Sequence, residues 1–143
     1  MSSVPAEYRS WLAKAEEDRL CIRNELSASH TPWAIVAFHA QQAAEKTLKA
    51  LIVYHGRRPR QTHDLGEILN ACLDHDASLV GLRDACDRLS YFAVDARYPD
   101  LNREVAEDLA RLAVEHCERI CAAVRAKLPA ADQRGPQDGV VSR

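Results

Sequence analysis

Ten residues near the middle of the chain, GRRPRQTHDL at positions 56–65, bring cationic side chains together with a histidine. Arg57, Arg58 and Arg60 stay charged at every physiological pH and can donate paired hydrogen bonds to phosphate oxygens. His63 follows Arg58 after four intervening residues, and an imidazole can transfer a proton while a phosphodiester is cleaved. Three interpretations stay open here: an RNase dyad, a phosphate-binding patch without catalysis, and a solvated loop that begins a helix.

A second candidate site is the stretch ARYPD at positions 96–100. Arg97 can bind a phosphate, or it can pair with a carboxylate such as Asp95. Tyr98 can stack on a base or cover an apolar edge. The residue types alone do not choose between a binding site and a corner between helices.

Other polar residues have simpler explanations. One strip at spacings of three and four residues is expected to face solvent or a partner; it consists of His39, Gln42, Glu45 and Lys46. The cysteines at 21, 72, 86, 117 and 121 include no CxxC pair, so we interpret most of them as reduced core thiols. Zinc needs close pairs of ligands. We therefore predict neither a metal site nor a cofactor.

These side chains must be positioned by helices, because apolar residues recur at helical spacing between the prolines. The expected helices cover 6–26, 32–55, 63–74, 79–95 and 103–128. The second of them is the most apolar and contains many alanines, which let neighbouring helices approach closely. We therefore expect it to form the centre of the bundle.

Capping residues support these boundaries. Thr31 is a good N-cap, and Pro32 suits the first helical position of the second helix. Gly56 is a good stop for the same helix. Thr62 or Asp64 is expected to cap the third helix, and an acid there is favoured by the positive end of the helix dipole.

Length and composition are consistent with one small helical domain. The chain has 143 residues, of which 47% are hydrophobic and 28% charged. We predict an all-α, up-and-down bundle of four to five helices in residues 1–129, followed by a disordered tail in residues 130–143. The net charge of −2 provides no global basic field, so a polyanion must bind a local patch. An apolar signal core and an 18-residue apolar run are absent, which predicts a cytoplasmic protein without a membrane span.

Two longer stretches in a fixed order carry a family resemblance. The sequence FHAQQAAEKTLKALIVYHGRRPRQTHDL is followed, after 23 intervening residues, by LSYFAVDARYPD. Together they resemble the HEPN (higher eukaryotes and prokaryotes nucleotide-binding) domain family over roughly residues 8–127. The resemblance implies an α-helical bundle that often dimerises. It also implies one of two activities, a metal-independent RNase, often a toxin, or a module that binds RNA or nucleotides without cleavage. Small members often act beside a minimal nucleotidyltransferase antitoxin.

The RNase signature of that family is an arginine followed, after four to six residues, by a histidine late in the bundle. The matching arginine here is Arg97, and the positions where the histidine is expected hold Asn102, Arg103 and Glu104. The resemblance therefore implies an incomplete catalytic pair at this site. The pair Arg58 and His63 has the spacing but follows an earlier helix.

The functional hypothesis is binding of an RNA or nucleotide phosphate together with a protein partner. The candidate binding residues are Arg57, Arg58, Arg60, His63, Arg97 and Tyr98; the catalytic candidates are Arg97, Arg58 and His63. The expected partners are a second copy, with Trp33, Phe38 and Tyr54 on the extra face, and a nucleotidyltransferase antitoxin. The alternatives are a metal-independent RNase toxin and a dimeric scaffold without catalysis.

Overall fold

The computed structural model describes residues 6–93 and 104–132. Within these ranges the chain forms five α-helices, one 3-10 helix between the third and fourth of them, a short 3-10 turn after the fifth, and no strand. The helices are α1 (Glu7–Leu26), α2 (Trp33–Tyr54), α3 (Leu65–Leu73), α4 (Arg83–Ser90) and α5 (Glu107–Arg125). The predicted all-α fold is confirmed.

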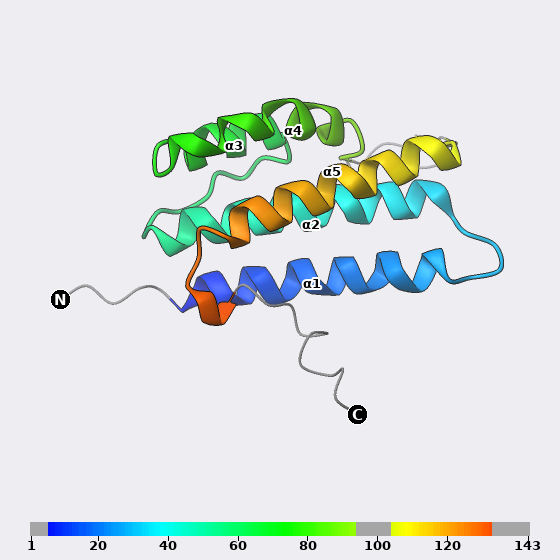
Figure 1. The fold of residues 1–143 in the computed structure, drawn as a ribbon, viewed down its shortest axis with the longest axis horizontal. Coiled ribbons are helices and arrows are strands. Elements are labelled where there is room, and N and C mark those ends of the chain that lie inside the picture. The colour runs from blue at the N-terminus through cyan, green and yellow to red at the C-terminus, as the bar shows by residue number, and fades with distance from the viewer. Residues whose placement is uncertain (1–5, 94–103, 133–143) are drawn as a thin grey trace.

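Helix α2 lies at the centre of the bundle, as its composition predicts. Its most extensive contacts are with α1 and α5, and it also contacts α3 and α4. Figure 1 shows α1 running antiparallel to α2, while α3 and α4 form a second layer on the other side. Candidate sites on α2 and on the loop after it therefore lie between α1 and the α3–α4 layer.

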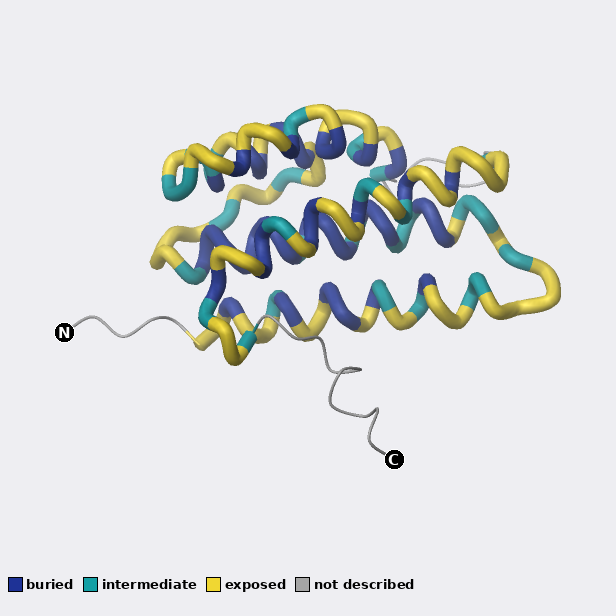
Figure 2. The backbone as a smooth tube through the Cα atoms, in the orientation of Figure 1, coloured by how far each residue is buried: buried dark blue, intermediate teal, exposed yellow. Residues whose placement is uncertain are grey.

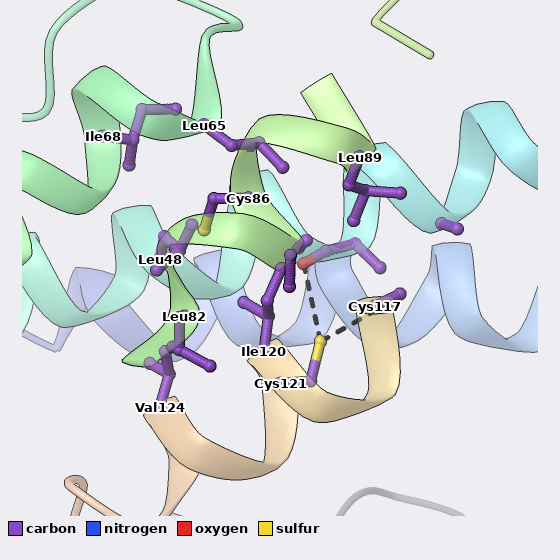
Figure 3. Packing of buried hydrophobic residues seen from close by; sticks show 14 of the residues in the cluster. Leu48, Leu65, Ile68, Leu82, Cys86, Leu89, Cys117, Ile120, Cys121 and Val124 are labelled. Carbon is purple, nitrogen blue, oxygen red and sulfur yellow. Dashed lines mark hydrogen bonds between the residues drawn. The ribbon is translucent and has the colours of Figure 1, made fainter. Parts of the chain in front are cut away.

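The core is continuous along α2. Leu48 and Leu51 are fully buried, and the four buried cysteines lie among apolar side chains from α3, α4 and α5. Figure 3 shows Leu48, Leu65, Leu89 and Ile120 meeting in this core. Figure 2 shows that the buried positions of each helix face the interior. The core therefore fixes the rotation of α2 and decides which of its polar side chains reach the surface.

The start of α2 differs from the prediction. The N-cap of α2 is Pro32, with φ −80° and ψ 91°, and it makes no side-chain cap hydrogen bond. The Thr31 hydroxyl instead donates to the carbonyl of Glu25 at 3.0 Å. Thr31 therefore completes the end of α1, and the predicted Thr31 cap is wrong because the hydroxyl is used there.

The helix predicted at 79–95 is divided in two within the described residues. Ala77–Leu82 form a 3-10 helix, and α4 begins at Arg83 and ends at Ser90. Leu79 and Leu82, three residues apart, are both buried. A spacing of three fits a 3-10 helix as well as an α-helix. The apolar pattern alone therefore could not distinguish them.

The folded contacts extend slightly beyond α5. Residues Ala130–Asp132 form a 3-10 turn, and the Tyr8 hydroxyl donates to the Asp132 carboxylate. Arg9 Nε donates to the same carboxylate at 3.1 Å. The rest of the predicted tail, residues 133–143, lies outside the described residues.

Candidate functional site

Helix α2 ends in a tight turn that leads into the arginine-rich loop. Gly56 has φ 79°, a left-handed conformation that glycine adopts without steric cost. Its N–H donates to the Val53 carbonyl at 2.9 Å, and the N–H of Arg57 donates to the Ile52 carbonyl at 3.1 Å. This pair of bonds is a Schellman motif, so the predicted stop at Gly56 is confirmed.

The loop after Gly56 forms one wall of an open cleft of about 510 Å³, which we call the arginine cleft. The side chains of Arg57, Arg58 and Arg60 are exposed. Residues from α1 and α2 form the remaining walls; the lining consists of Glu7, Trp11, Lys49, Val53 and residues 56–61. The cleft therefore combines four cationic side chains with one indole and one carboxylate.

A cation–π contact joins two of the residues that line the arginine cleft. Lys49 Nζ lies 5.7 Å from the centroid of the Trp11 ring, which brings α1 and α2 together at this point. Trp11 is only partly buried. Its indole can therefore supply an apolar surface beside the arginines.

His63 is held by a carboxylate from α2 rather than by its neighbour Asp64. Its Nδ1 lies 2.9 Å and 3.2 Å from the two carboxylate oxygens of Glu45. The Glu45 side chain is 5% exposed, whereas that of His63 is 66% exposed. Because an ionised carboxylate only accepts hydrogen bonds, Nδ1–H is the donor and Nε2 faces outward. Such an imidazole can exchange a proton with a ligand.

Glu45 is the centre of a buried polar network. Its carboxylate accepts from Gln41 Nε2 at 3.0 Å and from Lys49 Nζ at 3.0 Å. Burial alone would raise the pKa of Glu45, but hydrogen bonds from His63, Lys49 and Gln41 outweigh burial and hold the pKa below its ordinary value. Glu45 therefore stays ionised and connects Lys49, in the arginine cleft, to His63.

Asp64 caps α3, as one of the two predicted alternatives. Its Oδ1 accepts from the N–H of Gly66 at 2.9 Å and from that of Glu67 at 3.4 Å. The Thr62 hydroxyl accepts from the N–H of Asp64 at 3.1 Å. The cap leaves His63 beside a separate hollow of about 460 Å³; its lining consists of His63, Asp64, Asp87, Ser90 and Ala93.

The predicted solvent-facing strip on α2 is wrong in part. Glu45 is buried in the network described above, and Gln42 Nε2 donates to Gln41 Oε1 at 2.7 Å. His39 Nδ1 lies 2.8 Å from Asp18 Oδ1, and Lys46 Nζ lies 2.6 Å from Asp18 Oδ2. The strip is therefore occupied by α1 on one side and by the His63 loop on the other.

The predicted site residues are not all gathered in one place. Arg57, Arg58 and Arg60 line the arginine cleft, whereas His63 lines the neighbouring hollow. Arg97 and Tyr98 lie outside the described residues. Sequence reasoning missed Trp11 and Lys49, and it placed Glu45 on an exposed strip. The four-residue spacing of Glu45 and Lys49 is compatible with an ion pair along α2, but it does not indicate that the pair is buried.

Two absences are observed within residues 6–93 and 104–132. No group of three or more histidine, cysteine, aspartate or glutamate side chains there is arranged to hold a metal ion. Over the same residues, no helix combines the length and the apolar character needed to cross a bilayer.

The described residues form an α-helical bundle with a cationic loop after its central helix. The sequence model of the HEPN domain matches residues 8–127, and the chain belongs to this family. The crystal structure of TT1696 from Thermus thermophilus is similar, with 28% sequence identity and a TM-score of 0.75. The match covers 87% of this chain and 100% of that one. No curated protein matches the sequence. Membership of the family supports a nucleotide- or RNA-related role in general.

Proposed function

We propose that the protein binds a phosphate group of RNA or of a nucleotide in the arginine cleft. The observation that carries this proposal is the convergence of Arg57, Arg58, Arg60 and Lys49 on one cleft. A phosphate there meets several guanidinium donors, and hydrogen bonds between charged groups are about twice as strong as neutral ones. Glu7 is the one carboxylate in the lining, so the cleft keeps a positive balance.

Removal of Arg57 and Arg58 is expected to weaken binding of a labelled RNA by about ten- to a hundred-fold, because two charge-assisted contacts are lost. The measurement is fluorescence anisotropy in EDTA with wild type and with Arg57→Ala/Arg58→Ala. The matched control is Arg23→Ala/Arg88→Ala, which removes two exposed arginines from α1 and α4. Wild-type binding should also fall as salt rises, because phosphate contacts release counterions. Equal losses in the two double variants would contradict the proposal.

A second candidate, metal-independent RNA cleavage, is favoured by the contact between His63 and buried Glu45. A carboxylate on Nδ1 orients the ring and leaves Nε2 free to take the proton of an attacking 2′-hydroxyl. We nevertheless propose binding without cleavage, since the late arginine of the family signature is not followed by its histidine. In the same EDTA incubation, His63→Ala should keep its RNA affinity, and wild type should leave the RNA intact. Cleavage by wild type that His63→Ala abolishes, with binding and folding unchanged, would make the loop catalytic.

The protein is also proposed to act as a homodimer. Trp33 and Tyr54 pack partly against the core, so they offer less free surface than the sequence suggests. Four exposed apolar side chains on α1, α2 and α5 are candidates for the interface; they are Leu20, Ile35, Leu109 and Leu112. Sedimentation at tens of micromolar is expected to give twice the 16.0 kDa chain mass. A single species at the chain mass would contradict the dimer.

The second proposed partner is a minimal nucleotidyltransferase that acts as an antitoxin. This proposal rests on the family resemblance alone. A short nucleotidyltransferase gene next to this one, and a complex of the two products on co-expression, are the expected findings. Failure of the co-expressed pair to form a complex would contradict it.

A further inference from the structure

The arginine cleft continues into a row of side chains along the seam between α1 and α2. Trp11 on α1 contacts Lys49 on α2 through the cation–π contact at 5.7 Å. Seven residues further along α1, Asp18 contacts Lys46 and His39 of α2 at 2.6 Å and 2.8 Å. Because residues seven apart lie on the same face of a helix, both contacts belong to one side of the α1–α2 pair.

This side of the pair differs from the side that α5 covers. Arg19 of α1 binds Glu118 of α5 at 2.7 Å, and Arg125 of α5 binds Glu16 of α1 at 2.6 Å. Those contacts fix α5 against the other face of α1. The side chains of His39 and Lys46 remain 23% exposed. We call the row of Trp11, Lys14, Asp18, His39, Lys46 and Lys49 the α1–α2 seam.

Lys14 adds an exposed cation to the α1–α2 seam. It follows Trp11 by three residues and precedes Asp18 by four, so helical geometry places it between them. With the arginine cleft, the seam carries six cationic side chains; they are Lys14, Lys46, Lys49, Arg57, Arg58 and Arg60. Against them stand the three carboxylates of Glu7, Asp18 and Glu45. Lys46 and Lys49 are paired with Asp18 and Glu45, so the surplus of positive charge on this side comes from Lys14 and the three arginines.

We propose that the ligand is a single-stranded polynucleotide that starts in the arginine cleft and continues along the α1–α2 seam. The inference rests on the proposed function of the arginine cleft and extends it from one phosphate to a strand. One phosphate meets the arginines, a base stacks on Trp11, and a further phosphate meets Lys14, Lys46 and His39. Stacking on an aromatic side chain beside a cationic track is how sequence-tolerant single-strand binding is built.

The α1–α2 seam is long enough that a strand can contact both of its ends, whereas a single nucleotide cannot. The seven-residue step from Trp11 to Asp18 spans about 10.5 Å at 1.5 Å per residue. The step from His39 to Lys46 has the same length. A mononucleotide in the arginine cleft therefore does not reach Asp18, whereas the next phosphates of a strand do. Asp18 partly neutralises Lys46, so a phosphate contact of Lys46 is expected to be weaker than an arginine contact.

The test compares two ligands, a fluorescein-labelled oligouridylate and adenosine monophosphate, on wild type, Lys14→Gln and Lys46→Gln. Each variant is expected to weaken oligouridylate binding about three- to ten-fold and to leave mononucleotide binding unchanged. The slope of log affinity against log salt should fall by about 0.7 for each lost phosphate contact. Lys127→Gln is the control, since it removes an exposed lysine beyond the end of α5 that pairs with Asp76 at 3.2 Å. Lys46→Arg keeps the positive charge, so it should bind the oligouridylate as wild type does, in contrast to Lys46→Gln.

Several outcomes would overturn the inference. These are equal effects of Lys14→Gln and Lys127→Gln, equal losses for both ligands, and displacement of the oligouridylate by oligoglutamate of similar charge. If Lys46→Gln lowers thermal stability, the exposed Lys14→Gln variant decides alone. Oligodeoxythymidylate is measured alongside oligouridylate to show whether the bound strand is RNA or DNA. Weak binding of both strands would contradict the proposal that a strand follows the seam. If Arg57→Ala/Arg58→Ala lowers the affinity for neither ligand, the proposed function is wrong. If it lowers the affinity for both ligands while the seam variants lower neither, only the inference about the seam is wrong.

Discussion

Replacing Glu45 with alanine is expected to lower the free energy of unfolding by about 3–5 kcal/mol, because it leaves a buried ammonium without its carboxylate. Lys49 Nζ lies 3.0 Å from Glu45, and the Lys49 side chain is only 8% exposed. The same substitution removes the acceptor of His63 and of Gln41. Urea unfolding at neutral pH, followed by circular dichroism, measures the loss.

Two other variants separate the causes of that loss. Lys49→Met leaves Glu45 with His63 and Gln41, so it should cost less than Glu45→Ala. Glu45→Gln removes the charge, so the free energy of unfolding should depend less on pH under acidic conditions. The folded pKa of Glu45 is lowered, so its contribution is fully present above the unfolded value of about 4.3. That contribution is lost as pH falls through the folded pKa. A Glu45→Ala protein as stable as wild type would contradict the buried network.

Glu45 also shows where reasoning from the sequence stops. Its spacing from Gln42 and its charge predicted an exposed strip, since periodicity within one helix describes only that helix. Glu45 is buried because the loop from Gly56 to Asp64 returns across α2 and places His63 on it. That return path depends on the docking of α3 and α4, which no local pattern encodes. Asp18 is buried for a similar reason, because two α2 side chains meet it from across the α1–α2 contact.

The helices themselves were predictable, since apolar spacing and alanine content act within each segment. The start and end of α2 illustrate the limit. Gly56 was correctly chosen as the stop, because the left-handed conformation there depends on one residue. Thr31 was wrongly chosen as the cap, because its hydroxyl binds the carbonyl of Glu25 in the preceding helix. Local backbone chemistry can be predicted, whereas competition between two helix ends for one hydroxyl cannot.

A second buried ion pair joins α1 to α5, and its two members have different numbers of charged partners. Glu16 Oε1 accepts from Arg125 at 2.6 Å and from Arg19 at 2.7 Å. Arg19 also binds Glu118, whereas Arg125 has Glu16 as its one carboxylate in the described residues. The side chains of Arg125 and Glu16 are 7% and 6% exposed. Glu16 therefore has two cationic partners, whereas the other hydrogen bond of Arg125 goes to the backbone carbonyl of Asp132 at 3.0 Å.

Replacing Glu16 with leucine is expected to cost about 3–5 kcal/mol of unfolding free energy, because Arg125 is then buried without a carboxylate. Arg125→Met is expected to cost about 1–3 kcal/mol, since Glu16 keeps its bond to Arg19. The double variant Glu16→Leu/Arg125→Met should recover most of the loss of Glu16→Leu, because no buried charge is left unpaired and the apolar side chains pack in its place. Urea unfolding of the three proteins at pH 7 measures the coupling between the two sites. A larger loss in Arg125→Met than in Glu16→Leu would show that Arg19 does not hold Glu16.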